Sequence, residues 1–304
     1  MKKFYSVMLA ALAFAACSPD DEEAIKVKSM SILPATATVY TDQALPELAL
    51  NVTPENALDG KTVTWTSSNP EVISVDADGV LAFEAKDIES AELPVTITAA
   101  VDGKTAASVI TVKGQIAKYG VLDLSSTVGL LMLDRNVGAS EVGKSGNYYQ
   151  WGKNTPVAVE GETAVNDNYS AEWSYTSAGI VDWTVAENTP CPMGWSIPDG
   201  EQMAVIDGIL EAIAMYDWGE ATDEEYDAAV ALLESMKVAE CGQFNKDHLE
   251  IYIPTAGYFW TAYVSEDKTQ VGVFENNLFP LFSKKRTFDV AVPVRCVKVA
   301  AAAE

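Results

Sequence analysis

Residues 191–198 read CPMGWSIP, and this stretch organises the second half of the chain. Its two prolines fix the backbone dihedral φ and remove backbone donors, while its glycine can adopt conformations closed to other residues. Its tryptophan is a large apolar side chain held between them. A helix signal follows at once, with Asp199 as N-cap, Gln202 three residues later and apolar residues beyond. We therefore predict a rigid corner that leads into a helix over residues 200–216.

The chain has 304 residues, a length typical of about two domains. Hydrophobic residues make up 48% of it, so it carries enough apolar material to form buried cores. Its net charge is −24, and such an acidic surface repels nucleic acid and anionic lipid headgroups. We therefore expect no nucleic-acid partner, although the acidity by itself names no other partner.

Residues 1–17 are predicted to be a targeting segment and not part of the fold. Two lysines open it, and the apolar run that follows is too short to span a bilayer as a resident helix. The small residues before Cys17 resemble a bacterial lipobox, in which the cysteine is lipidated and becomes the mature N-terminus. The alternative is an ordinary signal peptide with a chance cysteine.

The acidic residues 18–24 resemble the surface-export signal of Bacteroidetes lipoproteins. The alternative is that they form only a flexible, solvated tether. Together with Cys17, this stretch predicts a protein that is lipid-anchored in the outer membrane and exposed at the cell surface.

Three cysteines remain if Cys17 carries lipid, namely Cys191, Cys241 and Cys296. Outside the cytoplasm two of them can oxidise to a disulfide, which leaves one over, and their spacing does not decide which. No two cysteines form a CxxC motif, and His248 is the one histidine of the chain. A zinc site therefore has almost no ligands, and we expect no metal and no cofactor.

Residues 25–113 are predicted to form an all-β sandwich, because short apolar strands alternate with turn signals such as Asp-Gly and Asn-Pro. The segment contains no cysteine, so the stability of the sandwich must come from packing. Trp65 is expected to fill the centre of its core. The expected strands lie near residues 27–32, 48–52, 62–66, 72–75, 80–83, 95–99 and 109–112.

The run VTWTSSNPEVISVD at residues 63–76, followed by DGVL at 78–81, resembles the bacterial immunoglobulin-like domain of group 2. Residues 95–104 also fit this family, whereas residues 83–93 form a longer and more acidic connection than the family leads us to expect. Such domains serve as spacers or binding modules in surface adhesins and enzymes. We interpret this one as a spacer.

Residues 114–119 are predicted to be a linker, and residues 120–300 a second, α+β domain with much loop. A second helix is expected over residues 223–237, with Thr222 and Glu225 as a capping box. The expected strands of this domain lie near residues 130–139, 146–152, 249–262, 271–274 and 290–299, with a long irregular stretch over residues 153–190.

Four landmarks follow one another in the second domain: DRNVGA at 134–139, YQWG at 149–152, CPMGWSIP at 191–198 and PVRCV at 293–297. Together they resemble the Fibrobacter major paralogous domain (FISUMP), which is common in surface lipoproteins of Bacteroidetes. The resemblance implies an α+β fold similar to C-type-lectin-like domains and formylglycine-generating enzymes.

The same resemblance implies that Cys191 and Cys296 form a disulfide and that Cys241 stays free. Two departures from the family stand out. Ser196 occupies a position where the family often has arginine, and Gln202-Met203 replace an acidic-aromatic pair early in the helix.

We predict that the protein is not an enzyme. Formylglycine-generating enzymes need a reactive thiol pair and copper, whereas Cys241 stands alone. No serine or cysteine motif accompanies His248, and the acids at residues 223–225 complement a helix N-terminus. The calcium-friendly triplet Asn166-Asp167-Asn168 lacks the proline and tryptophan motifs of calcium-dependent lectins.

Three aromatic residues, Tyr169, Trp173 and Tyr175, lie in the irregular stretch and are the candidate ligand-binding residues, because loops often carry binding residues. The alternative is that they pack the loop against its own domain. The basic cluster at residues 284–286 is expected on a surface loop.

The sequence therefore predicts a surface lipoprotein that acts as a non-enzymatic binding or adhesion protein for a glycan or a protein. Two alternatives stay open, namely a structural or accessory subunit of a surface assembly and an enzyme of the formylglycine-generating type.

Overall fold

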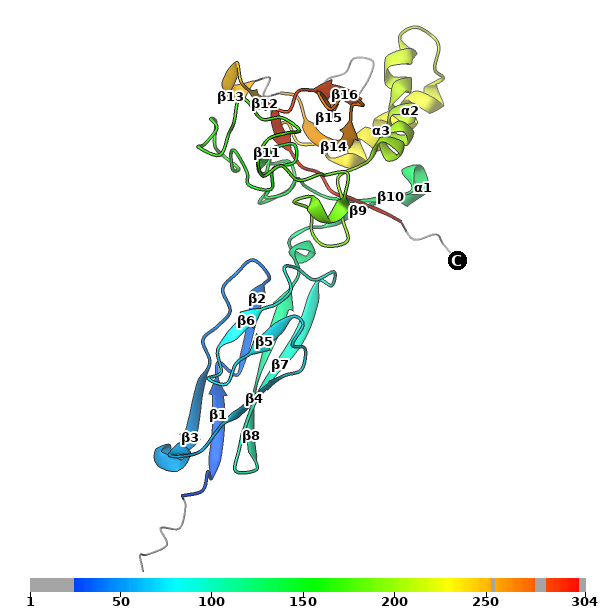
Figure 1. Ribbon diagram of the computed structural model, residues 1–304. Helices are drawn as coiled ribbons and strands as arrows, with labels where there is room; N and C mark the ends of the chain where they lie inside the picture. The colour runs from blue at the N-terminus through cyan, green and yellow to red at the C-terminus, as the bar shows by residue number, and fades with distance from the viewer. Residues whose placement is uncertain (1–24, 253–254, 277–282, 301–304) are drawn as a thin grey trace, which may run out of the picture.

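The structure is a computed structural model that describes residues 25–252, 255–276 and 283–300. The predicted targeting segment and Cys17 lie outside these ranges. A β-sandwich forms one end of the molecule and a mixed α+β region forms the other (Figure 1). Within the described residues, no helix has the length and apolarity that a membrane span requires.

The β-sandwich contains a four-stranded sheet in the order β2-β8-β7-β4, in which β2 runs parallel to β8 and the other pairs are antiparallel. Two-stranded sheets, β1 with β3 and β5 with β6, complete it. The strands are β1 (Ser29–Leu33), β2 (Thr36–Tyr40), β3 (Ala49–Thr53), β4 (Thr64–Ser67), β5 (Ile73–Val75), β6 (Leu81–Phe83), β7 (Glu92–Val101) and β8 (Lys104–Lys113), with a 3-10 helix at Glu55–Leu58.

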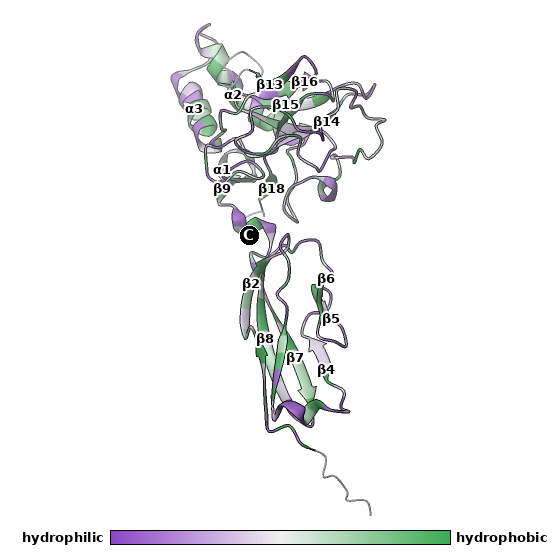
Figure 2. Ribbon diagram, turned by 90° about the vertical axis from the view of Figure 1, so that its left-hand side faces the viewer, coloured by the Kyte–Doolittle hydropathy of each residue, from purple (hydrophilic) through white to green (hydrophobic). Residues whose placement is uncertain are grey.

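The core of the sandwich follows from alternation along its two long strands. On β7, Val95 and Ile97 are fully buried, and on β8 Ile110 and Val112 are fully buried. Side chains in between point outward, as expected for a sheet with one covered face. Figure 2 shows the hydrophobic residues along both strands.

Trp65 is not the central plug that the sequence led us to expect. Its ring is half-buried and packs against the core cluster from the side, over Gly79. A Cβ atom at Gly79 would come within 2.7 Å of the Trp65 ring, which explains the glycine. Strand β2 was not among the strands predicted from the sequence.

The second region contains three small sheets, in the orders β18-β10-β9, β11-β17-β12-β13 and β14-β15-β16. The strands are β9 (Val121–Leu124), β10 (Leu130–Leu133), β11 (Tyr148–Gln150), β12 (Gln243–Asn245), β13 (His248–Tyr252), β14 (Tyr258–Val264), β15 (Val271–Glu275), β16 (Ser283–Arg286), β17 (Ala291–Pro293) and β18 (Val297–Val299). The helices are α1 (Ser125–Val128), α2 (Gly200–Tyr216) and α3 (Asp223–Met236), with 3-10 helices at Gln115–Lys118 and Ala186–Asn188.

Both predicted long helices form, and both predicted capping boxes are present. The Asp199 side chain accepts a hydrogen bond from the Gln202 amide, and Thr222 accepts one from Glu225 in the same way. These caps satisfy amides at the helix starts that have no partner within the helix. The apolar faces of α2 and α3 pack in one cluster, to which Met203, Ile206, Leu210, Ala229, Leu232 and Met236 contribute.

The single last strand predicted over residues 290–299 is wrong, because the chain breaks there into β17 and β18. Between them the carbonyl of Val294 accepts from the amide of Val137, and that of Cys296 accepts from Leu133. The break moves the chain from one sheet to another and buries the Arg295 side chain completely.

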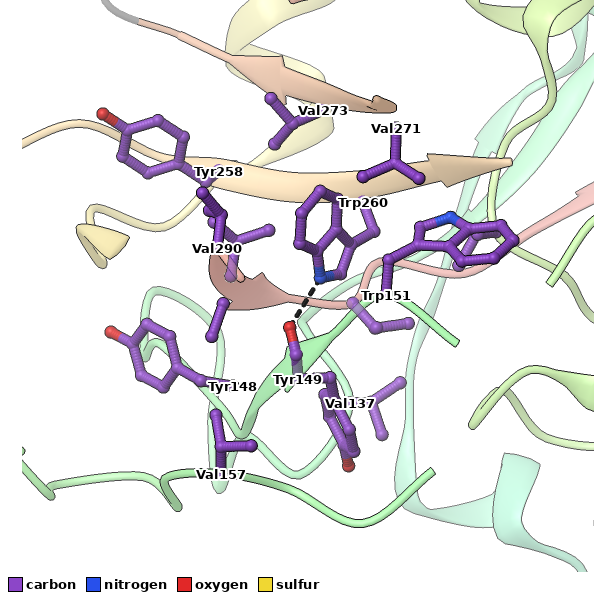
Figure 3. Packing of buried hydrophobic residues seen from close by; sticks show 14 of the residues in the cluster. Val137, Tyr148, Tyr149, Trp151, Val157, Tyr258, Trp260, Val271, Val273 and Val290 are labelled. Atoms are coloured by element: carbon purple, nitrogen blue, oxygen red, sulfur yellow. Dashed lines mark hydrogen bonds between the residues drawn. The ribbon is translucent and has the colours of Figure 1, made fainter. Parts of the chain in front are cut away.

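Tryptophans fill the core of the second region. Trp151, Trp183 and Trp260 are fully buried, and each indole N–H donates a hydrogen bond. In Figure 3 the Trp260 nitrogen points at the backbone carbonyl of Tyr149, at 2.6 Å. Because a buried indole needs a partner for its N–H, these bonds let large aromatic residues pack without an unpaired donor.

A short 3-10 helix joins the two regions, and Asp87 ties them together. Its Oδ1 accepts from the Gln115 amide of this helix, and its Oδ2 accepts from the Met193 amide in the predicted corner, at 3.0 Å. Lys118 forms an ion pair with Asp42 at 2.6 Å. Asp87 belongs to the acidic connection at residues 83–93, so the segment that departs from the immunoglobulin-like pattern holds the second region.

Candidate functional site

The corner at residues 191–198 is linked to the last part of the described chain by a disulfide and by backbone hydrogen bonds. Cys191 and Cys296 form a disulfide, as the sequence resemblance implies, with their Cα atoms 5.8 Å apart. Beside it, Ser196 and Val297 exchange two backbone hydrogen bonds of 3.0 and 2.7 Å. The ring of Trp195 is buried, as expected for a core residue. The corner therefore serves structure and presents no reactive group.

Trp173, one of the three aromatic residues predicted to contact a ligand, has a ring that is 9% exposed. Its indole N–H donates to the carbonyl of Trp151 at 2.8 Å, and the Lys153 ammonium lies 4.5 Å from its ring centroid. Both contacts are those of a core residue. Trp173 therefore packs against its own domain, which was the alternative stated for this loop.

Tyr169 and Tyr175 are half-buried and pack against the same core cluster. The Tyr175 ring meets Phe288 edge to face at 6.1 Å, and the Lys268 ammonium lies 4.4 Å from its centroid. Burial raises the pKa of Tyr169, whose hydroxyl has no hydrogen-bond partner in the described part of the chain. The three aromatic residues share a core and do not line the pocket described below.

His248 and the Asn166–Asn168 triplet also have structural surroundings. His248 is exposed and stacks on Tyr252, with ring centroids 4.1 Å apart. The side-chain amides of Asn166 and Asn168 both donate to the carbonyl of Pro156. Among the described residues, no three His, Cys, Asp or Glu side chains gather in a way that could hold a metal ion.

Cys241 is expected to be unreactive in the folded protein. Its thiol is buried, the Tyr258 amide donates to its Sγ at 3.4 Å, and burial raises its pKa to about 12. Because only the thiolate attacks, iodoacetamide at pH 8 should leave Cys241 unmodified in the native state and modify it in urea. Mass spectrometry after a timed quench measures this, and modification of the native protein within minutes would instead support a reactive thiol.

A pocket of about 230 Å³ lies between the start of α2 and the β14-β15-β16 sheet. The helix contributes Gly200, Met203, Ala204 and Asp207, which recur at the spacing of one helical face. Across from them, the sheet contributes Thr261, Tyr263, Gly272, Ser283, Lys284 and Lys285. The wall is mostly apolar, and its few polar groups come from both sides.

The floor of this pocket depends on Gly272. A Cβ atom there would lie 2.2 Å from the Thr261 hydroxyl oxygen and 2.8 Å from the Tyr263 Cβ. The missing side chain therefore lets Thr261 and Tyr263 of the neighbouring strand occupy the space above β15. A glycine inside a strand commonly marks such a close approach.

Asp207 is the polar group that distinguishes this pocket. Its Oδ1 is buried and has no hydrogen-bond partner in the described ranges, and the same holds for the nearby Ser283 hydroxyl. Burial raises the pKa of Asp207. The side chain and backbone of Ser283 lie close enough to its carboxylate to lower the pKa in part, although no contact to Oδ1 meets the geometry of a hydrogen bond. An unpaired buried carboxylate oxygen destabilises the fold, so its presence in a concave pocket marks a candidate binding site.

Basic side chains stand on the opposite wall. Lys285 lies with its ammonium 5.0 Å from the Tyr263 ring centroid, and its interaction with that residue raises its pKa. Lys284 also lines the pocket. This corrects the sequence prediction for residues 284–286, which form the edge strand β16 and not a surface loop.

This pocket was not predicted from the sequence, although the sequence carries one signal of it. Asp207 follows Ile206 and lies four residues after Met203, so a carboxylate interrupts the apolar face of α2. An acid at such a position must be partly buried when the helix packs. Nothing local indicates which strands supply the other wall.

Residues 26–109 match the family model of the bacterial Ig-like domain (group 2). Comparison with curated proteins gives no match. The β-sandwich is therefore a bacterial immunoglobulin-like domain of group 2, a type typical of surface proteins. The matched residues end before the disulfide, the helices and the pocket begin.

Proposed function

We propose that the chain is a cell-surface lipoprotein, anchored through Cys17, that binds a glycan without catalysis. The immunoglobulin-like domain acts as the spacer, and the second region, a FISUMP domain with a C-type-lectin-like fold, carries the pocket beside α2. Support for the anchor comes from the lipobox-like residues before Cys17. Support for FISUMP comes from the four ordered landmarks between residues 134 and 297.

The unpaired Oδ1 of Asp207 carries the proposal for the pocket. A cationic ligand that pairs with this carboxylate would meet Lys284 and Lys285, and an anionic ligand would meet Asp207. A neutral polyol satisfies both walls, because sugar hydroxyls donate to a carboxylate and accept from an ammonium group. The apolar C–H face of a sugar ring can pack on Tyr263 and Met203.

The volume of the pocket limits the size of the bound group. Sites for drug-sized molecules span about 300–1,000 Å³, and this pocket has about 230 Å³. It therefore suits one sugar ring at the end of a longer glycan, with the rest of the glycan outside.

Replacement of Asp207 by Asn is expected to weaken glycan binding by at least about tenfold, because a hydrogen bond to a charged acceptor is lost. Glu211→Gln is the matched control, since this exposed acid lies one turn further along the same helix. A glycan array followed by calorimetry with the best glycan measures both variants. Equal binding by Asp207→Asn and the wild type would rule out this pocket.

The same substitution is expected to raise the melting temperature at neutral pH. Since the folded pKa of Asp207 lies above its ordinary value, the carboxylate reduces stability increasingly as the pH rises from about 4 through the raised pKa. Asn removes this cost, so the gain should be largest at pH 7 and vanish near pH 4. Thermal unfolding across that range measures it, and a loss of stability at pH 7 would show that Asp207 stabilises the fold.

A role as an accessory subunit of a surface assembly is the second candidate. The observation that favours it is the exposed tip of the helical hairpin, which lies away from the pocket.

A further inference from the structure

The turn between α2 and α3 projects an aromatic side chain into solvent. Trp218 is 66% exposed, and Tyr216 beside it is 38% exposed. Figures 1 and 2 both place this end of the hairpin on the side of the molecule opposite the immunoglobulin-like domain. A single exposed apolar residue is common, but an exposed tryptophan at such a tip is a frequent anchor in protein interfaces.

The tip, residues 216–223, is held in one conformation. The amides of Gly219 and Glu220 donate to the carbonyls of Tyr216 and Met215, and Gly219 takes the left-handed φ of +71° that this turn requires. The Tyr216 hydroxyl donates to Asp223 at 2.8 Å, which links the two helices across the turn. A partner would therefore meet a preformed surface and would not have to order it.

The surroundings of Trp218 are strongly acidic. The sequence contains no Lys, Arg or His between Lys153 and Lys237. Asp223 accepts a hydrogen bond from the Tyr216 hydroxyl, and the Glu225 carboxylate accepts one from the Thr222 amide at the start of α3, so both acids have structural roles. The exposed carboxylates of Asp217 and Glu220, on either side of Trp218, form no hydrogen bond or ion pair within the described residues.

We infer that this tip docks a lysine- or arginine-rich segment of another protein. An ammonium or guanidinium group can lie over the exposed Trp218 ring while Asp217 and Glu220 neutralise its charge. The same carboxylates would repel anionic lipid, and a neutral sugar or lipid would give them no cationic partner. The tip therefore fits a cationic protein better than either.

This surface is separate from the proposed glycan pocket. Asp207 and Tyr216 are nine residues apart on α2, which corresponds to about 14 Å along a helix. The chain would thus offer two binding surfaces on one helix, with different ligand chemistry at each.

The test uses the full chain and a fluorescein-labelled peptide of alternating lysine and glycine, with binding followed by anisotropy. We expect Trp218→Ala to weaken binding by at least about tenfold. Tyr252→Ala is the matched control, since this residue is 40% exposed on β13, outside the tip, and it should bind within about twofold of the wild type. The double variant Asp217→Asn/Glu220→Gln should bind the peptide weakly. Its control is Glu172→Gln/Glu187→Gln, which also removes two exposed acids of the base-free stretch and should bind the peptide as the wild type does.

Equal binding by Trp218→Ala and the wild type would overturn the inference, because the peptide would then sense only the general acidity of the chain. The inference would also be overturned if Trp218→Ala abolished binding of the protein to phosphatidylcholine vesicles or to the glycan array while peptide binding stayed unchanged. The tip would then bind lipid or sugar. Trp218→Ala should leave glycan binding in the pocket as it is, so failure here is distinguishable from failure of the proposed function.

Discussion

Replacement of Arg295 by methionine is expected to destabilise the protein by about 3–5 kcal/mol, one of the two largest effects of any substitution considered. The side chain is fully buried. Its guanidinium donates to Asn136 Oδ1 and to the carbonyls of Leu133, Met236 and Lys237, at 2.9–3.0 Å. Methionine fills much of the volume but removes the donor of all four acceptors. Three of these hydrogen bonds are buried, and each buried group left unpaired costs about 1–3 kcal/mol.

The position of Arg295 explains why one side chain matters so much. Two of its partners, Met236 and Lys237, carry carbonyls at the C-terminal end of α3, where helix carbonyls lack partners within the helix. The other two, Leu133 and Asn136, lie at and after the end of β10. The guanidinium therefore joins a helix, a sheet and the last segment of the chain, and its positive charge suits the negative end of the helix dipole.

Urea unfolding followed by fluorescence measures this effect. Lys144→Met is the matched control, because its side chain is 53% exposed and its ion pair with Glu141 lies at the surface, where such pairs contribute about 0–1 kcal/mol. Arg295→Lys should fall between Arg295→Met and the wild type, since an ammonium group cannot reach all four acceptors. A loss below about 1 kcal/mol for Arg295→Met would show that water or rearranged backbone replaces the guanidinium.

Removal of the disulfide by Cys191→Ala/Cys296→Ala is expected to destabilise the protein by about 4–5 kcal/mol in the chain-entropy description. The two cysteines are 105 residues apart, so the bond greatly restricts the unfolded chain. In the folded protein it fixes the corner before α2 to the segment before β18. The Ser196–Val297 hydrogen bonds remain, but they hold the same contact without constraining the unfolded state.

Unfolding in the presence and absence of reductant measures the contribution of the disulfide. The wild type should lose stability on reduction, whereas the double alanine variant should be insensitive to reductant, which serves as the internal control. Peptide mapping without reduction should recover Cys191 linked to Cys296. A bridge that contains Cys241, or equal unfolding midpoints with and without reductant, would contradict the assigned role.

The effects of Arg295 and Cys296 should not add independently. The two residues are neighbours in the break between β17 and β18, and substitutions that share an element usually couple. A triple variant that combines Arg295→Met with the double alanine substitution should therefore deviate from the sum of the separate losses.

The four sequence landmarks meet one another in the fold. Asn136 of the first accepts from Arg295 of the last, Trp151 of the second and Trp195 of the third belong to one core cluster, and the corner is linked to the last landmark through its disulfide. These contacts give the landmarks structural roles. The two proposed binding surfaces instead use Asp207 and Trp218, which lie outside all four landmarks.

The sequence alone determined the features that depend on neighbours along the chain. The helices α2 and α3 start where capping residues lie three positions before their partners, and their apolar residues recur at helical spacing. The strands of the immunoglobulin-like domain follow alternation between turns, which is also a local signal. The roles of Asp199 and Thr222 could therefore be predicted from a few adjacent residues.

Which segments face each other follows from the packing of the folded chain and not from local patterns. The burial of Trp173, the break between β17 and β18, and the pocket formed by α2 with β14 and β16 depend on contacts between residues far apart in the chain. Asp207 is an acid on a helix in the sequence, and its Oδ1 becomes a buried atom without a hydrogen-bond partner among the described residues only when the sheet packs beside the helix. Local patterns fix hydrogen bonds along the backbone, whereas burial and pairing of a side chain are set by what packs against it.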